Sequence, residues 1–173
     1  MRIFKKKYNL NLFDRIVLKC WIVLEKYIQN KKSIALSSQL GSIGSNTVLE
    51  DSVTLNRPHN IFIGSNCYIG KNCVLDAYTD IRIEQNCQVA QDCKFITGNH
   101  AKIKGRKPSK FDYDLAPIKI GKSVWIGFNV VILPGVEIGD NCIIGAGAVV
   151  TKSFENNKII TGIPAQISGF IKD

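Results

Sequence analysis

A period of six residues runs through the stretch from Ile120 to Thr151. Divided into sixes, it is IGKSVW, IGFNVV, ILPGVE, IGDNCI and IGAGAV, followed by VTKSF. An amphipathic helix repeats every 3.6 residues and a half-buried strand every two, so neither explains this spacing. A hexapeptide period is typical of a parallel β-helix, in which three short strands and their turns complete one coil. We therefore predict that this stretch forms stacked coils.

Two positions of each hexapeptide are predicted to fill the interior of the coil. The first position is aliphatic and the fifth is small or branched. Each strand is too short to be stable alone, so stacking at the strand spacing of about 4.8 Å must satisfy the backbone and build one continuous core. The first positions are Ile120, Ile126, Ile132, Ile138, Ile144 and Val150, and the fifth positions are Val124, Val130, Val136, Cys142 and Ala148.

The same frame occurs earlier in the chain with a longer period. Repeats begin at Ile43, Ile63 and Ile83, so the period there is 20 residues, as 18 residues plus a two-residue insert. We expect about five coils, three of them before a non-repetitive loop at residues 97–117 and two after it.

Asparagine and cysteine recur at fixed places in the repeat. The asparagines share one turn, where Asn suits positive φ and can bridge successive coils. The cysteines stand where Val or Ala stands elsewhere, so we interpret them as small buried hydrophobes of a reducing compartment rather than as disulfides. There is no CxxC pair, and we expect no metal site. The asparagines are Asn46, Asn66, Asn86 and Asn141, and the cysteines are Cys67, Cys73, Cys87, Cys93 and Cys142.

The N-terminal segment is predicted to be helical because apolar residues recur at helical spacing from Phe13 to Ile28. The apolar stretch is broken by Lys19, which argues against a signal peptide, and it falls short of the ~20 residues needed to span a bilayer. We expect the helix to end near Asn30 and to pack on the base of the β-helix. The alternative is a peripheral membrane contact through residues 1–30, whose first turn is basic.

Three segments follow from these patterns: a helical segment at 1–33, a hexapeptide β-helix domain at 34–155 with the excursion loop 97–117, and a C-terminal extension at 156–173. The net charge of +9 indicates anionic partners. Charge is the only feature that would favour nucleic acid, and no motif supports it, so we expect no nucleic-acid partner.

We predict that the loop at 97–117 carries the chemistry, because long loops in regular scaffolds are usually functional. His100 stands at its start, whereas the second histidine, His59, lies in a turn between regular coils and is interpreted as solvated. We predict His100 as a catalytic base. The 20-residue period aligns Asp80 with His100 along one edge, so Asp80 is a candidate to orient it.

The repeats, the loop after His100 and the stretch PIKIGKSVWIGFNVVILPGVEIGDNCIIGAGAVVTK…TGIPA resemble the hexapeptide-repeat acyltransferases. The resemblance is closest to the galactoside, maltose and bacterial polysaccharide O-acetyltransferases and covers about residues 43–166. It implies an all-β fold, a single-stranded left-handed parallel β-helix with an N-terminal helix and one long loop. It also implies a homotrimer with sites between subunits and acetyl-coenzyme A as the donor substrate.

Individual positions match the site of this family. His100 matches the general base, and Trp125 matches the tryptophan that packs along the pantetheine arm of the donor. Phe128 stands at a position that often lines the donor site. Expected contacts with coenzyme A come from Ala146, Thr151 and Lys152, and expected contacts with the acceptor come from Asp80, Asn99 and Lys102.

Other positions depart from the galactoside enzymes. Gly70 and Tyr78 stand where those enzymes have an Asn and an acidic residue that meet the acceptor, and Gln166 and Gly169 replace basic residues that meet coenzyme A. We therefore predict acetyl transfer to a sugar hydroxyl of a bacterial surface polysaccharide, such as capsule or lipopolysaccharide, by a cytoplasmic enzyme. The membrane alternative would place the enzyme peripherally on the inner face of the membrane.

Three other functions are compatible with a hexapeptide β-helix. An N-acetyltransferase of a nucleotide-linked amino sugar would have the same fold and donor, so it remains the alternative. The carbonic-anhydrase branch of the fold needs three zinc-binding histidines, and the chain has two. A non-catalytic structural trimer is disfavoured by Trp125 and by the Ala146–Lys152 matches.

Overall fold

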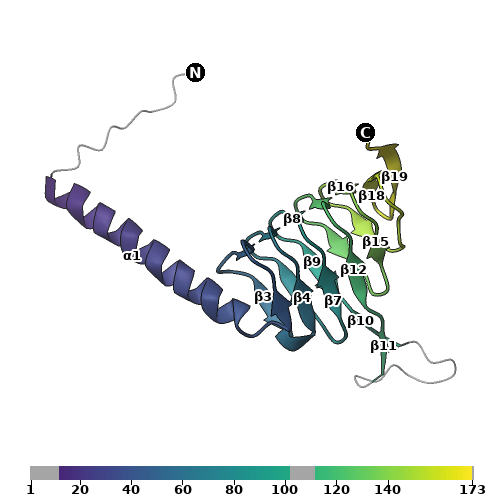
Figure 1. Ribbon diagram of the computed structural model, residues 1–173, viewed down its shortest axis with the longest axis horizontal. Coiled ribbons are helices and arrows are strands. Elements are labelled where there is room, and N and C mark those ends of the chain that lie inside the picture. The colour runs from purple at the N-terminus through teal and green to yellow at the C-terminus, as the bar shows by residue number, and fades with distance from the viewer. Residues whose placement is uncertain (1–11, 102–111, 173) are drawn as a thin grey trace.

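The computed structural model describes residues 12–101 and 112–172, which form one helix followed by a rod of stacked β-coils (Figure 1). Helix α1 spans Leu12–Ser37. From Ser42 onward the chain winds through three parallel sheets in turn, which we name A, B and C. The architecture is thus a parallel β-helix preceded by a helix, as the hexapeptide period predicts.

Each coil contributes one short strand to each sheet, so the sheets form the three sides of a prism. Sheet A contains β1 (Ser42–Ile43), β4 (Ile61–Ile63), β7 (Ile81–Ile83), β12 (Ile118–Ile120) and β15 (Glu137–Ile138). Sheet B contains β2 (Val48–Leu49), β5 (Tyr68–Ile69), β8 (Gln88–Val89), β13 (Trp125–Ile126) and β16 (Ile143–Ile144), with β18 (Lys158–Gly162) and β19 (Ala165–Phe170) beyond them. Sheet C contains β3 (Thr54–Asn56), β6 (Val74–Asp76), β9 (Lys94–Ile96), β14 (Val131–Ile132) and β17 (Val149–Val150).

The interior of the prism is filled as predicted. All eleven interior positions assigned between Ile120 and Val150 are at most 3% exposed. The strands from β1 to β17 are two or three residues long. The parallel register of the coils places each interior residue on its equivalent in the next coil, for example Ile83 on Ile63 and Ile120 on Ile83. Stacking therefore gives each short strand the neighbours that it needs for stability.

The asparagine turns have the structural role expected of them. Asn46, Asn66 and Asn86 all have φ near +60°, a conformation that Asn tolerates better than most residues. The amide of Asn46 donates to Asn66 Oδ1 at 3.3 Å, and the amide of Asn66 donates to Asn86 Oδ1 at 3.2 Å. Asn141 extends the same arrangement to Asn157 at 2.8 Å. These side chains connect successive coils outside the core.

The five repeat cysteines are buried and form no disulfide, which confirms their interpretation as interior hydrophobes. Their thiols donate to carbonyl oxygens of the adjoining coil, for example Cys87 Sγ to Gly121 O at 3.1 Å. The sixth cysteine, Cys20, is exposed on α1.

Helix α1 does not pack on the base of the β-helix, so that expectation is wrong. It runs to Ser37, seven residues beyond Asn30, and projects away from the rod (Figure 1). Trp21 is 62% exposed and Val23 is 67% exposed. Apolar spacing defines a helix face but not the partner of that face, which explains the error. The described residues include no helix with the length and hydropathy to cross a bilayer.

Two antiparallel hairpins interrupt or end the rod. In the first, β10 (Gly98–His100) pairs with β11 (Tyr113–Leu115) inside the predicted excursion. In the second, β18 (Lys158–Gly162) pairs with β16 and then with β19 (Ala165–Phe170), which folds back over the last coil. The second hairpin closes one end of the prism.

Candidate active site

The first hairpin leaves the prism at the corner where each coil passes from sheet C to sheet A. We call this corner the C/A edge; it comprises the connections after β3, β6, β9, β14 and β17. The chain departs after Thr97 and returns at Ala116, whose N–H donates to Thr97 O at 3.0 Å. The hairpin that carries His100 is therefore anchored at both ends in one coil.

His100 lies directly opposite Tyr113 in the hairpin register, and the two rings stack with centroids 4.8 Å apart at 27°. Tyr113 also stacks on Tyr78, with centroids 4.8 Å apart at 29°. The guanidinium of Arg57 lies 3.4 Å from the Tyr78 centroid. We call the four residues Arg57, Tyr78, Tyr113 and His100 the aromatic stack.

Two neighbouring residues allow the aromatic stack to form. Gly98 leaves space for the Tyr78 ring, since a Cβ at that position would lie 3.2 Å from the ring. Thr97 is fully buried; its hydroxyl donates to Asp76 O at 3.0 Å and accepts the N–H of Thr79 at 3.2 Å. The turn that carries Tyr78 is thus tied to the residue from which the hairpin begins.

The two tyrosines influence each other electrostatically. Their phenol oxygens lie 3.4 Å apart and share a hydrogen bond. This bond, with Arg57 as a second cause, lowers the pKa of Tyr78, and the same bond raises the pKa of Tyr113.

Asp80 does not align with His100, so the 20-residue extrapolation is wrong there. The hairpin displaces His100 from the repeat, and the next coil resumes with Ile118 opposite Ile81. The backbone oxygen of Asp80 accepts the N–H of Ile118, and its carboxylate pairs with Arg82 at 2.7 Å. The described contact of the His100 ring is its stack on Tyr113, and no periodicity in the sequence indicates that these two residues pair.

Three of the predicted donor residues lie together around sheet B. Trp125, on β13, points outward and is 56% exposed, and Phe128, in the following turn, is 52% exposed. The backbone oxygen of Phe128 accepts the N–H of Gly147 at 2.8 Å, which brings the turn of Ala146 beside it. This group forms an open surface at the passage from sheet B to sheet C.

The other two predicted donor residues, Thr151 and Lys152, lie on the C/A edge after β17. The Lys152 ammonium donates to Gln166 Oε1 on β19 at 2.7 Å. They therefore share an edge with His100 but not with Trp125. The site residues fall into two groups on different edges of one prism.

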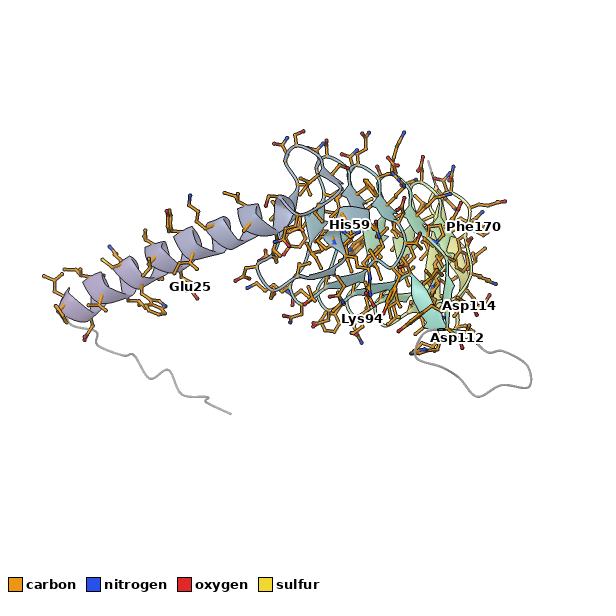
Figure 2. All side chains as sticks on the ribbon, turned by 90° about the horizontal axis from the view of Figure 1, so that it is seen from below. Glu25, His59, Lys94, Asp112, Asp114 and Phe170 are labelled. Atoms are coloured by element: carbon orange, nitrogen blue, oxygen red, sulfur yellow. The ribbon has the colours of Figure 1, made fainter. Side chains whose placement is uncertain are left out.

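The remaining predicted residues are near His100 in sequence. Asn99 is exposed on β10, opposite Asp114 of β11 in the register, and Figure 2 labels Asp114 together with Asp112, which precedes that strand. Lys102 lies outside the described residues. No group of three His, Cys, Asp or Glu side chains that could hold a metal occurs within residues 12–101 and 112–172.

Comparison with known proteins agrees with this architecture. Residues 117–152 match the bacterial transferase hexapeptide family (six repeats), and residues 60–90 match the hexapeptide repeat of succinyl-transferase. The chain is 37% identical over 145 residues to the galactoside O-acetyltransferase of Escherichia coli (strain K12), covering 83% of this chain and 70% of that protein. The chain belongs to the hexapeptide-repeat acetyltransferases.

Further similarities of this acetyltransferase extend beyond the galactoside enzyme. It is 30% identical over 125 residues to the putative colanic acid biosynthesis acetyltransferase WcaF of Escherichia coli (strain K12), covering 72% of this chain and 66% of that one. Its structure is similar to a galactoside acetyltransferase in complex with coenzyme A, with a TM-score of 0.75 at 33% identity, covering 80% and 68%. The predicted family and enzyme class are confirmed.

Proposed function

We propose that this acetyltransferase moves an acetyl group from acetyl-coenzyme A to a hydroxyl of a sugar, with His100 as the general base. The observation that carries the proposal is an exposed imidazole, held by a ring stack at the start of a hairpin that interrupts an otherwise regular rod. Family membership supports the acetyl group and the donor, since one similar structure is a complex with coenzyme A.

The chemistry assigns one role to the histidine and another to the backbone. A neutral imidazole nitrogen removes the hydroxyl proton as the oxygen attacks the thioester carbonyl, which contributes ~10²–10⁴ in rate. The tetrahedral oxyanion needs hydrogen-bond donors, for which backbone N–H groups suffice. When the intermediate collapses, the carbon–sulfur bond breaks and the proton passes from the imidazolium to the coenzyme A thiolate. Direct transfer requires both substrates to be bound together.

A homotrimer would complete the site. His100 and Lys152 lie on the C/A edge, whereas Trp125 and Phe128 lie on another side of the prism. A long donor molecule that contacts both groups must bridge two subunits, each contributing one edge. In this arrangement Trp125 packs along the pantetheine arm, and Ala146, Thr151 and Lys152 contact the rest of coenzyme A.

The proposed acceptor is a bacterial surface polysaccharide. The Asn and acidic side chains that would bind a small galactoside are replaced here by Gly70 and Tyr78. Tyr78 instead belongs to the aromatic stack. The net charge of +9 suits an anionic glycan, and the similarity to a putative colanic acid enzyme points to the same class. Asn99, Lys102 and Asp80 remain proposed acceptor contacts. The alternative acceptor is the amino group of a nucleotide-linked amino sugar.

The test is release of free coenzyme A from acetyl-coenzyme A by the purified chain with hydroxyl sugars, amino sugars and polysaccharides in parallel. His100→Ala should lower kcat by ~10²–10⁴. His59→Ala is the matched control, because it removes an exposed imidazole from the 3₁₀ turn Pro58–Asn60. Near-normal activity of the His100 variant would refute the base, and a preference for amino sugars would establish the alternative.

We also propose that the helical segment 1–33 serves as a peripheral membrane contact on the cytoplasmic side. In this division of roles, the β-helix domain 34–155 carries catalysis and the C-terminal extension 156–173 closes the end of the prism. Apolar residues from Leu12 to Ile28 cover roughly half of the α1 circumference at ~3.6 residues per turn, and they are exposed. Figure 2 shows side chains around the whole helix, which stands clear of the rod. A basic first segment beside such a face suits anionic lipid.

Flotation with phosphatidylglycerol vesicles tests this contact. Substitution of Trp21 or Val17 on the apolar face by Glu should abolish co-flotation, and high salt should weaken it. Glu25→Gln, on the polar face, is the control and should bind at least as well. Equal flotation of the Trp21 and Glu25 variants would contradict a membrane role for the apolar face.

A further inference from the structure

The imidazole of His100 stands at the end of a series of contacts that begins in the first coil. Arg57 is held by Asp76 at 3.1 Å and lies over Tyr78. Tyr78 stacks on Tyr113, and Tyr113 stacks on His100. Each residue of the series comes from a different connection or strand, so the contacts link the C/A edge of two coils to the hairpin.

The series is fixed to the prism at Tyr78, and its other end, His100, is exposed. Thr97, fully buried, fixes the turn of Tyr78 through the N–H of Thr79, and it begins the hairpin strand that carries His100. The two strands of the hairpin place His100 and Tyr113 opposite each other, so their rings project from the same face. The pairing of the two hairpin strands and the contacts of Thr97 therefore define the position of the imidazole.

The usual device for orienting a catalytic histidine is a carboxylate that binds one ring nitrogen. Here the candidate carboxylate, Asp80, is paired with Arg82. A stacked ring restricts the rotation of the imidazole plane without occupying either nitrogen. The stack contacts the face of the imidazole, whereas the two nitrogens lie on its edge.

We propose that Tyr113 is a positioning residue for His100, and that Tyr78 and Arg57 support Tyr113. The inference rests on the proposed role of His100 as the general base. The ring face is the functional part of Tyr113, and its hydroxyl contributes through the contact with Tyr78.

Tyr113→Leu and Tyr113→Phe separate ring stacking from the hydroxyl. Tyr113→Leu should lower kcat about tenfold, the size of a misoriented base rather than a missing one, with an unchanged KM for acetyl-coenzyme A. Tyr113→Phe retains the ring and should keep kcat within about twofold. The imidazole proton resonances of His100 should carry a ring-current shift that Phe preserves and Leu removes, with the His59 resonances as an internal reference.

The outcomes are distinguishable. If His100→Ala is inactive but Tyr113→Leu keeps the wild-type kcat, the positioning role is wrong and the proposed base stands. If His100→Ala is active, the proposed function fails, and the positioning role fails with it. Should Tyr113→Leu not fold, Tyr78→Leu replaces it; a lowered kcat with an unchanged KM for acetyl-coenzyme A supports the inference, and a wild-type kcat overturns it.

Discussion

The guanidinium of Arg57 lies over the ring of Tyr78 at 3.4 Å from its centroid and also pairs with the carboxylate of Asp76 at 3.1 Å. Arg57 itself has φ +55°, in the left-handed region. A residue held in that conformation while it makes two side-chain contacts fixes the far end of the aromatic stack.

Arg57→Ala should lower the free energy of unfolding by about 1 kcal/mol, because it removes an exposed cation–π contact and a partly exposed ion pair. It should also lower kcat by a few fold through Tyr78 and Tyr113. Urea unfolding and steady-state kinetics measure the two effects.

Arg82→Ala is the matched control for Arg57→Ala. Arg82 likewise lies over a ring, that of Phe62 at 4.1 Å, and pairs with a carboxylate, that of Asp80. It lies outside the aromatic stack. A comparable loss of stability with a smaller change in kcat is expected, and equal losses of kcat would show that Arg57 acts only through stability.

Tyr113→Phe and Arg57→Ala should each raise the pKa of Tyr78. The hydrogen bond with the Tyr113 hydroxyl is the largest single cause that lowers this pKa, and the Arg57 guanidinium lowers it through both a hydrogen bond and its charge. Both favour the phenolate, so removing either moves the titration to higher pH. Carbon-13 NMR of labelled tyrosine rings measures it, with Tyr78→Phe assigning the signal. An unchanged or lowered pKa would contradict the arrangement.

Thr97→Val should destabilise the fold by about 1–3 kcal/mol, although the two side chains have similar shapes. The substitution leaves the N–H of Thr79 without its acceptor in a partly buried turn. Thr97→Ser is the matched control, since it retains the hydroxyl and loses one methyl group. Denaturant unfolding compares the two variants, and a Val variant more stable than the Ser variant would argue that the hydroxyl is dispensable.

Trp125→Phe should abolish most of the fluorescence change that coenzyme A causes. The chain has two tryptophans, Trp125 on sheet B and Trp21 on α1, and both are exposed. If Trp125 packs along the pantetheine arm, Trp21→Phe should leave the change intact. The Phe variant should also raise the KM for acetyl-coenzyme A more than that for the acceptor. A fluorescence change that disappears only in the Trp21 variant would remove Trp125 from the donor site.

Most of the rod could be predicted because every coil repeats the same requirement. A narrow interior accepts aliphatic residues such as Ile126 and small ones such as Ala148, and these residue types recur at the same positions of every repeat. The asparagine ladder and the buried cysteines follow from the same periodicity. Errors began where the period ends: extrapolating 20 residues beyond Asp80 ignored the hairpin that shifts His100 out of the repeat.

The environment of His100 could not be predicted for a related reason. Tyr113 lies opposite His100 only because β10 and β11 pair, and no periodicity within the excursion indicates that pairing. Tyr78 stood out in the sequence as a departure, but its contacts with Arg57 and Tyr113 come from different coils. The direction of α1 could not be predicted either, since an apolar face such as that around Trp21 does not specify what covers it.

The excursion is closed twice by the backbone before its described part ends. The N–H of Ala116 bonds to Thr97 O at 3.0 Å, and the N–H of Ala101 bonds to Asp112 O at 2.9 Å. These two bonds fix where the chain leaves the coil and where it returns, whatever lies between residues 101 and 112. Changes of length or composition there should leave the register of the rod intact, so the acceptor contacts proposed for the excursion can change, or be exchanged by grafting, without refolding the scaffold.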